Sequence, residues 1–333
     1  MTAFGKGQGK GQGEAAYDHA GGPASLLLSY ALAATHDGVA GNWDPSSGPT
    51  KQPTFGGKND GDLSYLNAET RGDLVDAILR QAFSVTGAVG TATLSRSGKD
   101  ILTLTRPGAK VFRDQMRLVR AYADLRIDRA EEIFVQIDDL LSFFGTVGLL
   151  DTGRRRNSLE LLSAVIRLAE HVEMPLKHYC RAARPIDWSP KVQPMIQTPD
   201  HSTYPAGHAL ECFAAATVLH RLMSGKGPKG QLDEMPFRIA HRIAVNRVVA
   251  GVHFPVDNAA GALLGLLLGE AVFALACGKA PPTATATAPD FTKWAGDVTP
   301  DVLDQALPAD QTGKPDTATP LGWLWDRAQA EWR

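Results

Sequence analysis

Apolar residues recur every three to four positions through most of the chain between residues 70 and 277, which is the spacing of amphipathic helices. The spacing predicts helices at 70–86, 109–127, 129–149, 157–183, 206–224, 235–250 and 255–277. Alternation typical of strands is scarce, and the best case, Thr91 to Thr105, predicts a small hairpin or an extended arm. We therefore expect an all-α fold whose core is a multi-helix bundle.

The segments on either side of this helical region differ in composition. Residues 1–22 are rich in Gly, Gln and Lys, which predicts a disordered tail. Between about 37 and 68, Gly, Asn, Asp, Ser and Pro dominate and predict a long loop. We assign residues 23–280 to one helical-bundle domain and residues 281–333 to a linker and a C-terminal loop arm.

The C-terminal arm carries Trp323, Trp325 and Trp332, an unusual choice for a free tail. Large apolar side chains favour burial, so the arm is expected to dock either on the bundle or on a second copy of the chain. The sequence leaves both arrangements open.

Charge and cysteine content exclude several classes of protein. The 34 basic and 36 acidic residues give a net charge of −2, which favours neither a nucleic-acid partner nor an acidic membrane surface. Cys180, Cys212 and Cys277 are odd in number and lack metal-binding spacing, so neither a disulfide framework nor a structural zinc site is expected.

Two apolar stretches bear on membranes and export. Residues 259–277 approach the length of a membrane span but contain Glu270 and several glycines, which favours a buried bundle helix and no integral span. Ala24 to Ala33 has the length of a signal-peptide core, but the preceding segment holds Glu14 and Asp18. We expect it to be the first helix of the fold, which favours a cytoplasmic location and leaves export open.

The first of three segments with candidate chemistry contains Lys177 and Arg184. Seven residues separate them, close to two helical turns, so both are expected on one helix face as an anion clamp. Pro185 is expected to end that helix. Taken alone, the pair is better explained as two solvated basic residues at a helix end.

The second segment is Pro205-Ala-Gly-His208. Pro205 suits the entry of a helix, where unpaired backbone N–H groups would point at a bound anion. Gly207 would let that anion approach the backbone closely, and His208 could exchange a proton with it. Alone, this segment could equally be a helix cap without chemistry.

The third segment runs from Arg247 to Asp257. Arg247 lies near the end of one predicted helix, and Pro255 begins the next. Asp257, four residues after His253, could accept from one ring nitrogen and leave the other free as a nucleophile or ligand. A purely structural His–Asp pair is the alternative for this segment alone.

Other polar clusters carry less information. Asp138-Asp139 is expected on the exposed side of an amphipathic helix. His171 and Glu173 are two residues apart and would face different ways on a helix, so they predict no joint metal site.

Together the three segments resemble the superfamily shared by type-2 phosphatidic-acid phosphatases, bacterial acid phosphatases and vanadium-dependent haloperoxidases. Its pattern is Lys-x6-Arg-Pro, Pro-Ser-Gly-His and Ser-Arg-x5-His-x3-Asp, matched here over about residues 170–278. The resemblance implies a helical bundle in which an oxyanion is held by Lys177, Arg184, Gly207 and Arg247. It also implies that His253 bonds to phosphorus or vanadium, that Asp257 orients His253, and that His208 is the acid–base partner.

The chain departs from that pattern at two positions. Ala206 replaces the serine whose hydroxyl would contact the anion, and losing one such donor is expected to weaken binding by about 1–3 kcal/mol. Asn246 replaces the serine before Arg247, outside the direct oxygen contacts.

The resemblance allows three functions. We expect a vanadium-dependent haloperoxidase that oxidises halide with hydrogen peroxide at a vanadate held by His253. The chain looks soluble, and His201 lies seven residues before the motif histidine His208, where bromoperoxidases also have an extra histidine. His201 is accordingly a candidate for the halide side, or else a surface-loop histidine. A soluble phosphatase acting on phosphomonoesters or phospholipid-type substrates through a phosphohistidine at His253 is the alternative, and the short gap between His208 and Arg247 favours it. The third reading is a catalytically reduced anion-binding protein.

Overall fold

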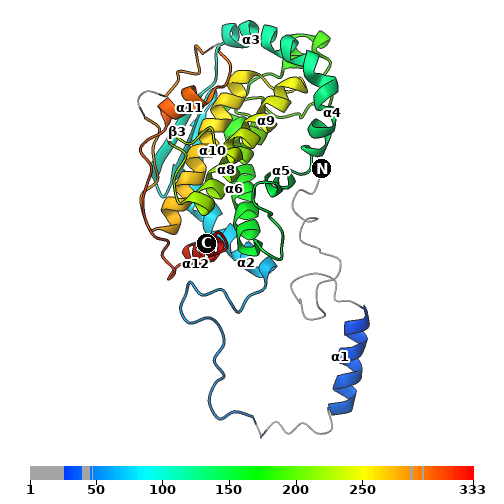
Figure 1. Cartoon of the computed structure of the whole chain (residues 1–333), viewed down its shortest axis with the longest axis vertical. Coiled ribbons are helices and arrows are strands. Elements are labelled where there is room, and N and C mark those ends of the chain that lie inside the picture. Colours follow the sequence, from blue (N-terminus) through cyan, green and yellow to red (C-terminus); the bar gives the residue numbers. More distant parts are fainter. Residues whose placement is uncertain (1–25, 40–45, 47, 286–287, 295) are drawn as a thin grey trace.

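The computed structural model describes residues 26–39, 46, 48–285, 288–294 and 296–333, so the tail expected at 1–22 lies outside the described part. The fold is mostly helical, as predicted (Figure 1). The helices are α1 (Leu26–Val39), α2 (Ala68–Ala82), α3 (Ala109–Tyr122), α4 (Arg126–Val135), α5 (Leu141–Gly145), α6 (Arg156–Cys180), α7 (Pro185–Trp188), α8 (Gly207–Ser224), α9 (Met235–Val249), α10 (Pro255–Ala276), α11 (Pro300–Ala306) and α12 (Pro320–Ala330). The strands are β1 (Phe83–Ala88), β2 (Thr91–Arg96) and β3 (Lys99–Thr105).

The core is built around α8, which packs against α6, α9 and α10. Its contact with α10 is close because glycines follow one another at four-residue spacing on the facing side of α10. A Cβ on Gly261 would lie 2.4 Å from the Ala206 carbonyl, and one on Gly265 would lie 2.4 Å from the Leu210 carbonyl. Any side chain at these positions would push the two helices apart.

A three-stranded antiparallel sheet, in the order β1-β2-β3, lies against α6 and α10. The strand prediction for 91–105 is confirmed as the β2–β3 hairpin. The helix predicted at 70–86 is too long, because α2 ends at Ala82 and the chain continues directly into β1. Strand β1 pairs with β2 along its whole length, and this pairing of backbone groups outweighs a helical pattern that ends in β-branched residues.

The helix predicted at 129–149 is divided into α4 and α5 by residues 136–140. Asp139 explains the break, because its side chain accepts from the backbone N–H of Ser142 at 3.0 Å at the start of α5. Asp139 is therefore not simply on the exposed side of a continuous helix, as the sequence suggested. The break places Gln136 at the end of α4, facing the centre of the bundle.

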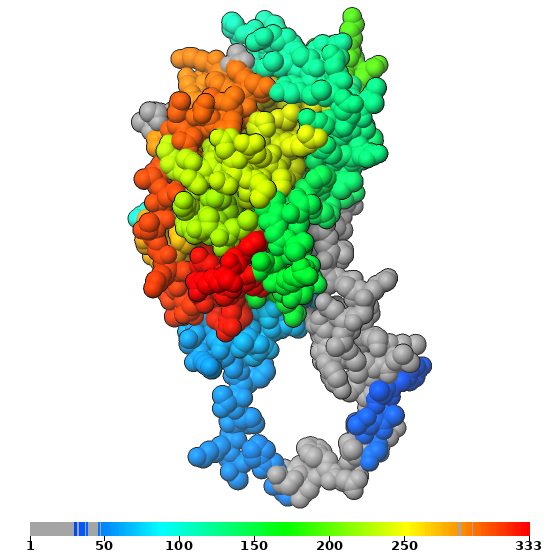
Figure 2. Space-filling view, in the orientation of Figure 1, coloured from blue at the N-terminus to red at the C-terminus, as the bar shows by residue number. Residues whose placement is uncertain are grey.

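The C-terminal stretch, expected as a loop arm, contains α11 and α12 and packs on the bundle (Figure 2). Trp325 is fully buried, with its ring centroid 5.2 Å from that of Phe273 in α10. Trp332 donates from Nε1 to Ser158 Oγ in α6 at 3.0 Å. These tryptophans therefore dock within the chain, and self-association through the arm stays a prediction.

Two observations concern the stretches that bear on membranes. The predicted first helix forms as α1, and the side chains described in it are exposed. Among the described helices, α10 has the length and apolar composition of a membrane-spanning segment, and 94% of its most apolar window is buried inside the protein. That burial is what a bundle-core helix requires. The cytoplasmic location stays a prediction.

Candidate active site

His253 lies in a buried hydrogen-bonded group at the start of α10. Its Nδ1 atom is 3.2 Å from Asp257 Oδ2, and the same oxygen accepts from the backbone N–H of Phe254 at 2.8 Å. The hydroxyl of Thr203 donates to this carboxylate oxygen at 2.5 Å. Asp257 occupies the first turn of the helix, where a carboxylate is stabilised by the helix dipole. The predicted pairing of His253 with Asp257 is present.

Arg184 determines which nitrogen of His253 carries the proton. Its Nη1 atom lies 3.1 Å from His253 Nε2. A guanidinium can only donate, so Nε2 must present its lone pair, and the ring proton must lie on Nδ1, facing Asp257. Burial, and then the charges of Arg184 and Lys177, lower the pKa of His253 well below its ordinary value. The ring is therefore neutral and presents an unprotonated Nε2, the form a nucleophile needs.

Arg184 reaches His253 from the end of a loop. The prediction that Lys177 and Arg184 lie on one helix face is wrong, because α6 ends at Cys180 and Arg184 is the N-cap of α7. Pro185 occupies the first position of α7, which keeps the preceding residue extended. The two cations still converge, but through tertiary folding and not through helical spacing.

Lys177 is buried with its ammonium group directed at the chain's own oxygens. Nζ donates to the backbone carbonyls of Ser202 at 3.0 Å and Pro205 at 2.7 Å, and lies 3.4 Å from Glu173 Oε1. Pro205 stands directly before the Ala206 N-cap of α8, at the entry of the helix. Burial lowers the pKa of Lys177. In this arrangement Lys177 contributes charge to the site without a free donor.

The carboxylate of Glu173 occupies the side of Gly207 on which another residue would carry its Cβ. A Cβ built there would lie 2.1 Å from Glu173 Oε1, so any other residue would require the Glu173 carboxylate to move. Glu211, one turn further along α8, hydrogen-bonds to Glu173, and burial together with that neighbour raises the pKa of Glu211 well above its ordinary value. A hydrogen bond between two carboxyl groups requires a proton, so Glu173 and Glu211 share one proton beside Lys177.

His208 lies in the first turn of α8, as predicted, and contacts the end of α4. Its Nε2 atom is 2.8 Å from the backbone carbonyl of Gln136. A carbonyl only accepts, so Nε2 carries a proton and Nδ1 is the nitrogen left for proton exchange. Burial and the nearby charge of Arg247 lower the pKa of His208 to about 3, so the ring is neutral without a bound anion. Negative charge brought into the site would oppose this shift.

Arg247 is buried at the end of α9 and has donors to spare. Its Nη2 atom donates to Gln136 Oε1 at 2.9 Å and to the Ile133 carbonyl at 3.2 Å. Its Nε and Nη1 atoms are buried without a hydrogen-bond partner among the described residues. Burial lowers its pKa to about 10, so the side chain remains charged at neutral pH. Unpaired buried donors are costly, and an oxyanion would satisfy both.

His201 and Ala206 lie beside these groups. Arg184 Nη2 is 3.2 Å from His201 Nδ1, and Arg184 Nε donates to the His201 carbonyl at 3.0 Å. Arg184 and His201, with Lys177, line a polar cavity of about 650 Å³. The backbone N–H of Ala206 donates to the carbonyl of Asp257 at 3.0 Å, which ties the start of α8 to α10. The methyl of Ala206 offers no donor to an anion.

Four polar residues of the site were not found from the sequence. Glu173 and Glu211 each have a signal in the spacing, because they lie four residues from Lys177 and Gly207 on a helix face. That spacing was not used to predict either residue, and Glu173 was assessed only together with His171 as a metal site. Thr203 and Gln136 have no such signal, since each is brought to the site from a loop or a helix end.

Comparison with known proteins identifies a family domain in the centre of the chain. The model of the PAP2 superfamily matches residues 159–277. Decaprenylphosphoryl-5-phosphoribose phosphatases from two strains of Mycobacterium tuberculosis are each 26% identical over 140 residues, which covers 42% of this chain and 72% of each relative. The centre of the chain is thus similar to the PAP2 superfamily, and both of these relatives are named as phosphatases. Gln136 and the rest of α4 lie outside the matched region.

Proposed function

We propose, from the PAP2 superfamily domain at residues 159–277, that this chain is a phosphatase that hydrolyses phosphoesters through His253. The observation that carries the proposal is the neutral His253 whose Nε2 faces Arg184 while its Nδ1–H faces Asp257. Two buried donors of Arg247 without partners add a place for phosphoryl oxygens. The relatives are phosphatases by name, which supports hydrolysis.

In the first step, the lone pair of His253 Nε2 forms a bond to phosphorus, and the ester oxygen leaves with the electrons of the P–O bond. His208 protonates that oxygen from Nδ1, after the charge of the bound ester has favoured its imidazolium form. The negative charge on the phosphoryl oxygens is stabilised by Arg184, Lys177 and Arg247. Asp257 stabilises the positive charge that develops on the His253 ring.

In the second step, water attacks phosphorus and the N–P bond breaks. His208, neutral after the first step, accepts a proton from the water, and Nε2 of His253 regains its lone pair. Phosphate is released and the site returns to its starting protonation. The balance needs no reactant other than ester and water.

The expectation of halide oxidation receives no support from the comparisons. The donor set nevertheless fits vanadate, because Arg247 Nε and Nη1 would be satisfied by any tetrahedral oxyanion. His253 Nε2 would be its ligand, with Arg184, Lys177 and the N–H of Gly207 around it. Bound vanadate would supply Lewis-acid activation of peroxide. Since one donor set serves both anions, it does not favour the haloperoxidase.

The test is hydrolysis of an aryl phosphate by the purified full chain without vanadate, with bromination of a diketone dye by peroxide and orthovanadate assayed in parallel. We expect hydrolysis, inhibited by orthovanadate. Bromination that requires vanadium, without hydrolysis, would establish the haloperoxidase instead. Binding of inorganic phosphate with neither reaction would establish the anion-binding protein.

Hydrolysis is expected to decline in acid below about pH 6. Burial raises the pKa of Asp257 to about 6, against the hydrogen bonds from Thr203 and Phe254. The carboxylate that accepts from His253 is therefore lost as the pH falls through that value, and kcat/KM should fall roughly tenfold per pH unit below it. The measurement uses two aryl phosphates whose own ionisation differs. A decline that moves with the substrate's ionisation would show that no group of the protein causes it.

Restoring the motif serine is expected to tighten anion binding. Ala206→Ser adds a hydroxyl donor at the start of α8, and one such donor corresponds to roughly tenfold in affinity. The inhibition constant of inorganic phosphate gives the readout. Ala216→Ser adds the same oxygen at a buried position of α8 away from the site and is the matched control. Equal effects of the two substitutions would mean that the residue-206 side chain does not face the anion.

A further inference from the structure

We infer that Gln136 is a further substrate-binding residue, which donates from its side-chain amide to the bound phosphoester at the inner end of an apolar cavity that takes the leaving group. The inference rests on the proposed phosphatase function. Gln136 and the cavity walls from α4 and α5 lie outside the PAP2 superfamily domain, so this part of the site belongs to the chain's own additional helices.

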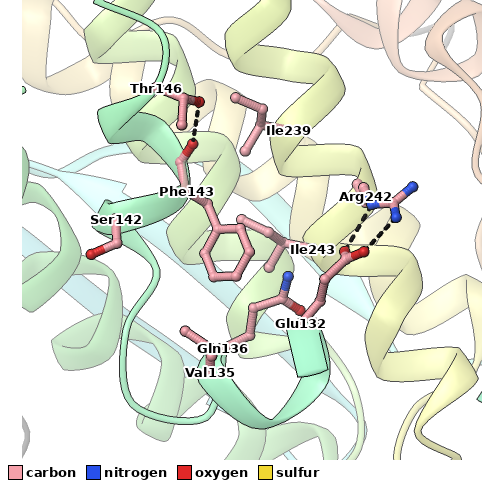
Figure 3. A pocket seen from close by; sticks show the side chains of 9 residues that line it. All are labelled: Glu132, Val135, Gln136, Ser142, Phe143, Thr146, Ile239, Arg242 and Ile243. Atoms are coloured by element: carbon pink, nitrogen blue, oxygen red, sulfur yellow. Dashed lines mark hydrogen bonds and ion pairs between the residues drawn. The ribbon is translucent and has the colours of Figure 1, made fainter. Parts of the chain in front are cut away.

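The orientation of the Gln136 amide follows from its neighbours. Its Oε1 atom accepts from Arg247 Nη2 at 2.9 Å and from Asn246 Nδ2 at 3.1 Å. Because both neighbours donate, the oxygen must face them, and the nitrogen is left for another acceptor. Figure 3 shows this nitrogen on the side of the cavity that Phe143 and Ile243 line.

The amide nitrogen of Gln136 has no hydrogen-bond partner among the residues that the structure describes. The side chain is only 1% exposed, and Nε2 is buried and unpaired, as are Nε and Nη1 of the adjoining Arg247. Three buried donor atoms on two touching side chains would cost free energy unless something accepts from them. A phosphoryl group, which carries only acceptors, is the group of matching chemistry. Gln136 then adds a donor to a site in which Ala206 has none.

Gln136 is one of the residues that line a cavity of about 350 Å³ (Figure 3), and its contact with Arg247 joins this cavity to the site. Ile239, Ile243 and Arg247 follow one another at four-residue spacing along α9, so the wall of the cavity continues directly to the anion-binding guanidinium. The ring of Phe143 from α5 closes the opposite side. The lining of the cavity is mostly apolar, and the Glu132–Arg242 ion pair borders the cavity.

His208 shows which part of the substrate this cavity would hold. The backbone carbonyl of Gln136 contacts His208 Nε2, so Gln136 is joined to both His208 and Arg247. In the proposed mechanism the Nδ1 atom of the same ring protonates the leaving oxygen, so the leaving group lies beside His208, whose other nitrogen contacts Gln136 at the cavity. The occupant is therefore the apolar part of the leaving alcohol, in a phosphomonoester of an alkyl or aryl alcohol.

The first experiment replaces the amide. Gln136→Met keeps the length of the side chain and removes the donor, while Gln136→Glu keeps an oxygen for Arg247 and Asn246. We expect both variants to bind inorganic phosphate and orthovanadate roughly tenfold more weakly, measured by calorimetry at a temperature where the melting curves show both variants to be folded. Wild-type affinity in Gln136→Glu would overturn the assignment, because it would show that only the contact with Arg247 matters.

The second experiment narrows the cavity. Hydrolysis of methyl, butyl and hexyl phosphate should show kcat/KM rising with chain length in the wild type. Ile239→Trp should remove this rise and leave the inhibition constant of inorganic phosphate unchanged, since phosphate has no leaving group. Met235→Trp, on the same helix but at a side chain that is 60% exposed, is the matched control. An unchanged chain-length dependence in Ile239→Trp would overturn the placement of the leaving group.

The two proposals fail in different ways. If the wild type hydrolyses none of these esters, the phosphatase proposal fails, and the calorimetric comparison of Gln136 variants still decides whether the amide binds an oxyanion. If the wild type hydrolyses them all and the Gln136 and Ile239 variants behave like it, the phosphatase stands and the inference about Gln136 and the cavity is wrong.

Discussion

His253→Ala is expected to abolish phosphoester hydrolysis while leaving most of the affinity for inorganic phosphate. The substitution removes the lone pair that attacks phosphorus, and removal of a catalytic nucleophile costs on the order of 10⁴–10⁶ in kcat. The positive charges of Arg184, Lys177 and Arg247 remain, so the anion-binding site persists. The measurements are steady-state hydrolysis of an aryl phosphate and calorimetric titration with phosphate.

The matched control is His171→Ala, at an exposed position of α6, which should change neither quantity by more than about twofold. Turnover above a tenth of wild type in His253→Ala would show that the nucleophile is another group. If the melting curve shows that His253→Ala is unfolded, the two measurements are repeated on His253→Gln. That substitution keeps a polar side chain between Arg184 and Asp257.

Glu270→Ala is expected to be the most destabilising single substitution considered. Glu270 in α10 and Arg221 in α8 form a two-bonded ion pair, with side chains 4% and 2% exposed. Arg221 also stacks over Phe273 with its guanidinium carbon 3.9 Å from the ring centroid, and donates to the Gln311 carbonyl. Removing one partner leaves a buried charge without compensation, which costs about 3–5 kcal/mol in the free energy of unfolding.

Chemical denaturation of Glu270→Ala, of a double variant of the pair and of a control variant tests this expectation. Arg221→Met combined with Glu270→Leu replaces the pair by apolar groups and should recover most of the lost stability, because no buried charge remains. Asp114→Ala, which breaks the exposed Lys110–Asp114 pair, is the control and should cost less than about 1 kcal/mol. Equal costs for Glu270→Ala and Asp114→Ala would show that the buried pair adds nothing to stability.

The helices of the bundle core could be predicted because their apolar periodicity continues over many turns. Helices α6, α8, α9 and α10 begin and end within a few residues of the predicted bounds. The errors lie where pairing between segments outweighs local pattern, at β1, and where one side chain ends a helix, at Asp139. The periodicity that predicts a helix contains no information on either event.

The sequence by itself determined the helical bundle, the start of α8 to within one residue and the pairing of His253 with Asp257, because these depend on spacing within a single element or turn. Only the tertiary structure decided how Arg184 reaches His253, which group lies against Gly207, and that Gln136 adjoins Arg247 and His208. Those contacts join residues 69 or more positions apart in two of the three cases. They depend on how helices pack, and no local pattern records the packing.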